Sequence, residues 1–161
     1  STIQIDFVMP ERFELEYAAK DGTMKRPVMI HRAIVGSPER FMMILLEHFA
    51  GAFPVWLSTV QAVIISVSEK HSKYAEKVRN EMAKINKEFR IKIDDSNETL
   101  QKKIRNAQLK KIPYMLVVGE KEEKKETANV RLRSGEVLGE MKIGKIAERI
   151  RKKIEEKSLE L

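Results

Sequence analysis

Cysteine is absent from the 161 residues of this chain, which excludes disulfides and thiolate metal ligands. Any bound metal would therefore need histidine or carboxylate ligands. Long apolar runs are absent too, since the richest stretch, FMMILLEHFAGAFPVWL, is interrupted by Glu47, His48 and Pro54 and falls short of the roughly 20 residues that cross a bilayer. The first residues show no secretory pattern. We therefore expect a soluble, cytoplasmic protein with no membrane partner.

Aromatic residues are also scarce, at 6% of the chain against 42% apolar residues, so a core must be mainly aliphatic. The length allows one well-filled core or two unequal units. The net charge of +7 is concentrated in residues 70–111, with 13 Lys/Arg against 6 Asp/Glu, whereas residues 1–69 hold 6 against 8 and residues 112–161 hold 12 against 10. Such a block suggests phosphate binding, although a solvated helix face explains it about equally well.

The first third of the chain alternates short extended segments with turns. IQIDF, FELEYA and RPVMIHRAIV, with KDGT as a turn, predict an antiparallel meander. Ser37, Pro38 and Glu39 predict a helix that starts at Pro38, is largely buried and stops at Gly51. Three strands and one apolar helix bury little surface by themselves, so we expect another chain or an absent N-terminal portion to cover them.

After about residue 60 the pattern alternates between strands and helices. Alternation of this kind predicts an α/β fold with a mostly parallel, doubly wound sheet, and we place the domain boundary between residues 55 and 56. Residues 120–126, EKEEKKE, are interpreted as a charged turn. The expected strands are AVIISV, RIKID, YMLVV and ANVRLRSGE, and the expected helices are centred on Val78, Ile104 and Ile146.

The segment HRAIVGSPERF, preceded by PERFELEY and RPVMI, resembles the third signature motif of class II aminoacyl-tRNA synthetases. Its leading histidine narrows the resemblance to the threonyl-tRNA synthetases, and EHFAGAFPVWLS, KIPYMLVVGEKE, VRLRSGE and LGEM extend it over essentially the whole chain. The resemblance implies that residues 1–55 are the antiparallel-strand and helix end of a class II catalytic domain, and that residues 56–161 are an anticodon-binding domain. One local departure is Thr59, where relatives usually carry proline.

The same resemblance assigns catalytic-domain residues. Arg40 is similar to the family's catalytic, ATP-binding arginine, although a structural ion pair with a nearby glutamate is the alternative reading of the residue itself. Ser37 is similar to a substrate-pocket serine and is also a sufficient helix N-cap. Thr2 and Gln4 resemble residues near the aminoacyl and ATP site, but alternation on a half-buried strand explains them nearly as well.

His31 by itself is more simply read as a hydrogen-bonded strand residue. In the threonyl family the matching histidine is one of three protein zinc ligands. The metal coordinates the amino and hydroxyl groups of threonine, and valine is rejected because it lacks the hydroxyl group. The family's other two ligands, a Cys and a His, precede this histidine. Since His48 and His71 have no ligand spacing to His31, we expect zinc only in a full-length enzyme.

Three residues match the family's anticodon readers, and each has an ordinary alternative. Asn97 suits bidentate pairing with a base edge but could cap the following helix. Glu122 can accept from base amino and imino groups but could be one charge of a solvated turn. Arg131 can donate to base carbonyls or stack, but is also one of two arginines read as facing opposite sides of a strand. Possible phosphate neighbours are Lys102, Lys103, Arg105, Lys110 and Lys111.

The resemblance therefore implies part of a threonine–tRNA ligase that uses ATP with Mg²⁺, threonine and tRNA(Thr), forms a homodimer and acts in the cytoplasm. The chain alone is expected to read an anticodon without aminoacylating, because the first two class II motifs are not found in it. The main alternative is a non-catalytic RNA- or protein-binding module that reuses the same fold. A flavodoxin-like small-molecule binder is weakly supported, since no Gly-rich phosphate loop follows AVIISV.

Overall fold

The computed structural model describes residues 2–161, which form two compact units. The first unit ends at His48 and the second spans Phe49–Leu161. The sequence interpretation placed the boundary after residue 55. Val55 is fully buried in the core of the second unit, which is a packing reason for the structure to divide earlier in the chain.

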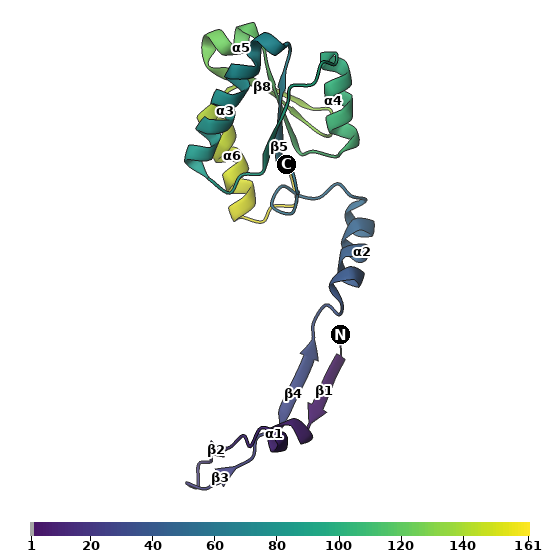
Figure 1. Cartoon of the computed structure of the whole chain (residues 1–161), viewed down its shortest axis with the longest axis vertical. Helices are drawn as coiled ribbons and strands as arrows, with labels where there is room; N and C mark the ends of the chain where they lie inside the picture. The colour runs from purple at the N-terminus through teal and green to yellow at the C-terminus, as the bar shows by residue number, and fades with distance from the viewer. Residues whose placement is uncertain (1) are drawn as a thin grey trace. The chain divides into compact units, whose positions relative to one another are not determined.

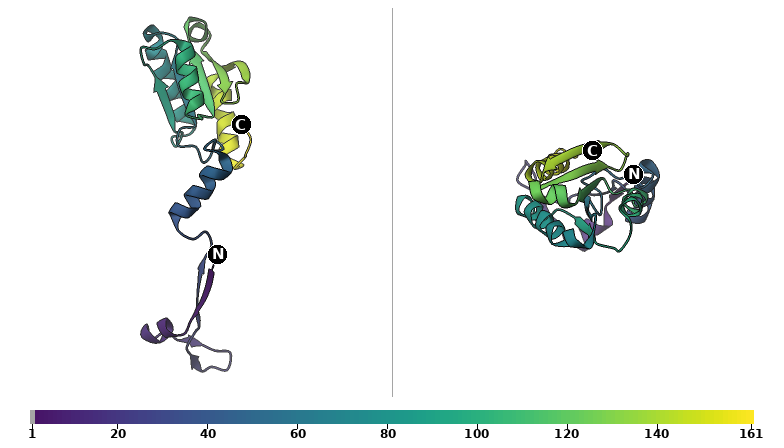
Figure 2. Two further views of the ribbon diagram at one scale, coloured as in Figure 1. Left: turned by 90° about the vertical axis from the view of Figure 1, so that its right-hand side faces the viewer. Right: turned by 90° about the horizontal axis from the view of Figure 1, so that it is seen from above.

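The first unit contains two short antiparallel pairs of strands. Its elements are β1 (Thr2–Asp6), α1 (Val8–Arg12), β2 (Tyr17–Ala18), β3 (Met24–Lys25), β4 (Met29–Ala33) and most of α2 (Pro38–Phe49). β1 pairs with β4, and the β2–β3 hairpin lies between them in sequence. In Figures 1 and 2, α1 and the hairpin lie at one end of the β1–β4 pair.

The predicted meander is therefore wrong, and Asp6 supplies the reason. Its carboxylate accepts hydrogen bonds from the backbone N–H groups of Val8 (2.8 Å) and Met9 (2.9 Å), which starts the short helix α1 directly after β1. The chain thus leaves the strand before the FELEYA segment can pair with it. Of that segment, only Tyr17 and Ala18 form a strand.

The helix predicted at Pro38 is present as α2, and Ser37 caps it by accepting from the N–H of Arg40 at 3.3 Å. The prediction that α2 is largely buried is wrong, because none of its residues is buried. The apolar side chains Met42 and Ile44 are 57% and 56% exposed. Short strand pairs and a five-residue helix offer too little apolar surface to cover a 12-residue apolar helix.

The second unit is built on one five-stranded sheet. Its strand order is β6-β5-β7-β8-β9, with β5 parallel to both β6 and β7, and β8 antiparallel to both β7 and β9. Only β8 therefore runs against the other strands, and the predicted α/β class is confirmed. The elements are β5 (Ala62–Ser66), α3 (Ser72–Ile85), β6 (Ile91–Asp94), α4 (Leu100–Leu109), β7 (Tyr114–Val118), α5 (Glu120–Lys125), β8 (Thr127–Leu132), β9 (Val137–Lys142) and α6 (Ile143–Glu155), with a 3₁₀ turn, η1, at Glu69–His71.

The helices cover the sheet unequally, as Figure 1 shows. Along β5, Ile64 belongs to the core that includes residues of α3 and α6, whereas Val63 and Ile65 belong to the core that includes residues of α4. Two helices thus cover one face and α4 alone covers part of the other. None of the helices among residues 2–161 has the length and apolarity that crossing a bilayer requires.

Two elements differ from the sequence interpretation. Residues 120–125 form the helix α5 rather than a charged turn, with an i,i+4 pair from Lys124 to Glu120 at 2.7 Å. Strand β9, which follows the predicted Ser134-Gly135 turn, was not expected. Its alternation is obscured by Gly139, which has a φ of 84° and stands opposite Val130 beside an irregularity in the β8–β9 pairing.

Candidate nucleic-acid interface

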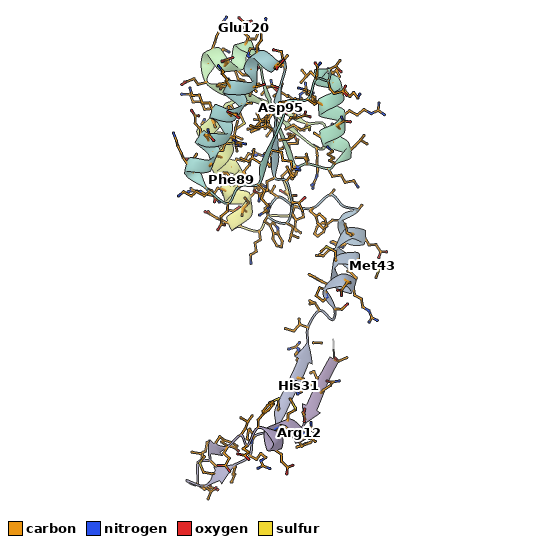
Figure 3. All side chains as sticks on the ribbon, viewed as in Figure 1. Arg12, His31, Met43, Phe89, Asp95 and Glu120 are labelled. Carbon is orange, nitrogen blue, oxygen red and sulfur yellow. The ribbon has the colours of Figure 1, made fainter. Side chains whose placement is uncertain are left out.

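The carboxyl ends of the parallel strands carry two of the three predicted anticodon readers. Asn97 follows β6 and Glu122 lies in the first turn of α5, directly after β7. Because β6 and β7 are both parallel to β5, these strands end at the same edge of the sheet. Asp95 begins the loop after β6, and Glu120 begins α5. Figure 3 labels both residues toward the same end of the unit. Ligands of open α/β sheets bind at this type of edge.

Asn97 lies exposed in the loop between β6 and α4, with no hydrogen-bond partner among the described residues. Thr99 is the N-cap of α4, since its hydroxyl accepts from the N–H of Lys102 at 3.4 Å. The alternative that Asn97 caps this helix is therefore wrong. The Asp94 carboxylate shapes the loop by accepting from the N–H of Ser96 at 3.2 Å and from its hydroxyl at 2.6 Å. The Asn97 amide is left available to a ligand.

Glu122 is half-buried and fixed by the turn before α5. One of its carboxylate oxygens accepts from the N–H of Gly119 at 3.0 Å. A Cβ on Gly119 would lie 3.1 Å from a methyl group of Val67 and 3.2 Å from the Glu122 carboxylate, so glycine permits this close approach. Glu122 therefore keeps one oxygen for another donor while the other is held in place.

Charged contacts hold α5 to the rest of the sheet edge. Nδ1 of His71, in η1, lies 2.6 Å from the Glu123 carboxylate. Lys77 of α3 pairs with Glu126 at 2.6 Å, and Lys125 pairs with Glu140 of β9 at 2.9 Å. These contacts raise the pKa of Lys77 and Lys125, because the paired carboxylates stabilise the ammonium forms. Residues 120–126, which include Glu122, thereby contact η1, α3 and β9.

Arg131 lies on the half of the sheet that α4 leaves uncovered. It stands opposite Met115, a residue of the core that includes α4 residues, so its side chain shares the α4 face. It is half-buried and has no hydrogen-bond or ion-pair partner among the described residues. Arg133 differs, since it lies beyond the end of β8 and donates to the carbonyl of Phe53. The reading of two arginines on opposite sides of a strand is thus wrong.

Asn129 is a residue of this face that the sequence interpretation missed. It stands two residues before Arg131 on β8 and opposite Val117. Its Oδ1 is buried without a hydrogen-bond partner among the described residues, which is costly unless a ligand or water supplies a donor. The period of two along the strand could have identified it from Arg131.

The cations predicted to lie near phosphate separate into two groups. Lys103 is only 3% exposed, and its ammonium donates to the backbone carbonyls of Ser66 (3.0 Å) and Asp94 (3.4 Å). Its assignment as a phosphate contact is wrong, because burial commits it to tying the ends of β5 and β6 together. Lys102 pairs with Glu98 at 2.8 Å and Lys111 donates to the Ala50 carbonyl. Arg105 and Lys110 are exposed, with no partner among the described residues.

In the first unit, Gln4 and His31 stand directly opposite each other in the β1–β4 pair. Nε2 of His31 lies 3.1 Å from the Asp6 carboxylate, whose pKa is lowered chiefly by the hydrogen bond from the Met9 N–H. Thr2 stands opposite Ala33 in the same ladder. The guanidinium of Arg40 has no partner among the described residues, so the ion pair considered as its alternative is not formed within residues 2–161.

The described residues do not complete a zinc site. Within residues 2–161 no group of three or more His, Cys, Asp or Glu side chains is arranged to hold a metal ion. His31 has only Asp6 as a nearby carboxylate, and a catalytic zinc site of the expected type needs three protein ligands.

Comparisons with known proteins show similarity along most of the chain. The family model described as "Anticodon binding domain" matches residues 61–153. The chain is 50% identical over 158 residues to the threonine–tRNA ligase of Caldanaerobacter subterraneus subsp. tengcongensis. The aligned region covers 98% of the chain and 24% of that protein. It is also 50% identical over 150 residues to the threonine–tRNA ligase of Magnetococcus marinus, covering 93% and 23%. The chain thus spans about a quarter of the length of these relatives.

Solved structures are similar over most of the chain. The RNA binding domain of threonyl-tRNA synthetase from Cryptosporidium parvum Iowa II has a TM-score of 0.80 and 39% identity, over 93% of this chain and 38% of that one. The prolyl-tRNA synthetase of Cryptosporidium parvum has a TM-score of 0.61 over 91% of this chain and 32% of that one. At 20% identity, it indicates the shared fold alone.

Proposed function

We infer the function from one premise, which is that this chain belongs to the anticodon binding domain family. We propose that it is the C-terminal part of a threonine–tRNA ligase and that its second unit binds the anticodon loop of tRNA(Thr). The main support is the edge of the sheet where Asn97 and Glu122 follow β6 and β7, the two strands that flank β5 in parallel, with hydrogen-bonding atoms left over. Similarity to threonine–tRNA ligases along nearly the whole chain supports the choice of tRNA.

Each residue of the proposed interface suits one task in binding unstacked bases. The Asn97 amide offers a donor and an acceptor to one base edge. The second carboxylate oxygen of Glu122 accepts from a base amino or imino group. Arg131 donates to a base carbonyl or stacks on a base from the open face of the sheet. Arg105 and Lys110 attract phosphates, and this attraction weakens as the salt concentration rises.

The first unit is proposed to contribute to an active site that is completed in the whole ligase. There Arg40 would bind the phosphates of ATP, delivered with Mg²⁺, and Ser37, Thr2 and Gln4 would lie near threonine and ATP. His31 would be one zinc ligand of that larger protein. A cytoplasmic homodimer is the proposed state of the whole ligase, and the chain alone is not expected to aminoacylate.

Binding to anticodon stem-loops tests this proposal. The chain should bind a threonine anticodon loop more tightly than an unrelated one, with affinity that falls as salt rises, measured by fluorescence anisotropy. Arg131→Ala should remove about 1–3 kcal/mol of discrimination between the two loops. Lys110→Ala should weaken both loops alike, because phosphates carry no sequence.

Two results would overturn the proposal. Equal affinity of the unchanged protein for both loops at one salt concentration would remove the claim of anticodon recognition. A larger loss of discrimination from Lys110→Ala than from Arg131→Ala would show that the assignment of residues is wrong.

A further inference from the structure

A groove of about 630 Å³ lies beside the Asn97 loop, on the face of the sheet that α4 partly covers. Val63 of β5, Ala107 of α4 and the apolar side chains of Phe53 and Val60 give it apolar walls. All of its lining residues belong to the second unit. The groove is large enough for one nucleotide and is accessible from solvent.

The two ends of the groove differ in charge. Asp95, Ser96 and Glu98, which flank Asn97, line one end. Because α4 begins beside this loop and ends at Leu109, Lys110 and Lys111 lie at the other end. One end thus offers hydrogen-bond acceptors and the other offers positive charge, which matches the base and the phosphate of a nucleotide.

Several polar groups in the groove have no partner among residues 2–161. The side chains of Lys92, Asp95, Asn106 and Lys110 make no hydrogen bond or ion pair there. In contrast, the hydroxyl of Ser58 donates to backbone carbonyls in its own segment. Donors and acceptors therefore remain free above an apolar floor, as expected where single-stranded nucleic acid binds by base contact and phosphate attraction.

We propose that this groove holds a second unpaired nucleotide of the same RNA loop, which lies outside the anticodon triplet and next to the base that Asn97 contacts. The base lies against Val60, Val63 and Phe53 within reach of Asn106, and the phosphate lies near Lys110 and Lys92. Continuity with the Asn97 loop favours RNA over a free small molecule, since three groove residues flank Asn97. The inference rests on the proposed binding of an anticodon loop.

The test combines abasic RNA with two variants of the full chain. Each loop nucleotide outside the anticodon triplet is replaced in turn by an abasic one, and one replacement should weaken binding about tenfold. Asn106→Trp, which fills the groove, should weaken binding of the intact loop to the same extent and remove the effect of that abasic position. Lys110→Glu changes only the surface and should lower both the affinity and the salt dependence.

A matched control is Lys84→Glu, the same charge change in the last turn of α3, the helix on the opposite face of the sheet. This variant should bind the RNA loop with nearly the affinity of the unchanged protein, apart from a small loss caused by the change in net charge. The inference is overturned if Asn106→Trp and Lys110→Glu match Lys84→Glu while Asn97→Ala still weakens binding. If the unchanged protein binds no loop, the proposed function itself fails, and the groove inference fails with it.

Discussion

The two units differ in how they use apolar residues. Of residues 2–48 only Pro10 is buried, although Ile3, Ile5, Phe41 and Ile44 are among many apolar side chains there. The second unit buries its apolar residues on both faces of a single sheet. The comparison shows that apolar content does not make a core unless the elements carrying it face one another.

The largest expected difference between the two units is in the free energy of unfolding, and a matched pair of leucine substitutions measures it. Leu116 of β7 is fully buried, whereas Leu46 of α2 is 48% exposed. Leu116→Ala should therefore lower the free energy of unfolding by about 2–5 kcal/mol. Leu46→Ala should change it by less than about 0.5 kcal/mol. Urea denaturation followed by circular dichroism measures both, and similar losses would mean that α2 is packed in the isolated chain.

A second pair of substitutions compares how a buried tyrosine of the second unit and an exposed tyrosine of the first unit affect stability at high pH. Burial raises the pKa of Tyr74 to about 12, and its hydroxyl donates to the Thr127 carbonyl at 2.8 Å. The unfolded chain loses this phenolic proton near pH 10, so Tyr74 favours the folded state fully below pH 10 and loses that effect as pH rises toward 12.

The difference in unfolding free energy between the unchanged protein and Tyr74→Phe should accordingly shrink between about pH 10 and 12. Tyr17→Phe, at an exposed tyrosine of the first unit, should show no such trend. Denaturation midpoints at stepped pH values provide the measurement. A constant difference for Tyr74→Phe would contradict the burial argument.

The smallest effect is local and lies in the β2–β3 hairpin. A hydrogen bond from Lys25 at 2.8 Å, with others from Thr23, lowers the pKa of Asp21 to about 2. This stabilisation is present above about pH 3.8 and is lost as pH falls through 2. Lys25→Met should raise the pKa toward 3.8, measured by NMR titration of the Asp21 carboxyl carbon. An unchanged pKa would show that the hairpin is not formed in solution.

The sequence was sufficient where hydrophobic pattern alone decides the structure. The AVIIS part of AVIISV and all of YMLVV form strands buried on both faces, and the stripe containing Val78 and Met82 lies on α3 as predicted. The sequence failed where charge conceals order, because EKEEKKE looks like a solvated turn, whereas residues 120–125 form α5 and pair with His71 and Glu140, which are distant in sequence. It also failed at Lys103, since no local pattern reveals that an ammonium is buried between two strand ends.

The sequence by itself determined the α/β class, and it supplied the residue types of the proposed interface at positions 97, 122 and 131. Tertiary structure decided which of these groups are free. Thr99 rather than Asn97 caps α4, and the N–H of Gly119 donates to one carboxylate oxygen of Glu122. Arg131 lies on the part of the sheet face that α4 leaves uncovered. Tertiary structure also placed α3 and α4, which carry about half of the basic residues of segment 70–111, on opposite faces of the sheet. The reason is that local periodicity fixes an element, whereas hydrogen-bond partners depend on packing between residues far apart in the chain.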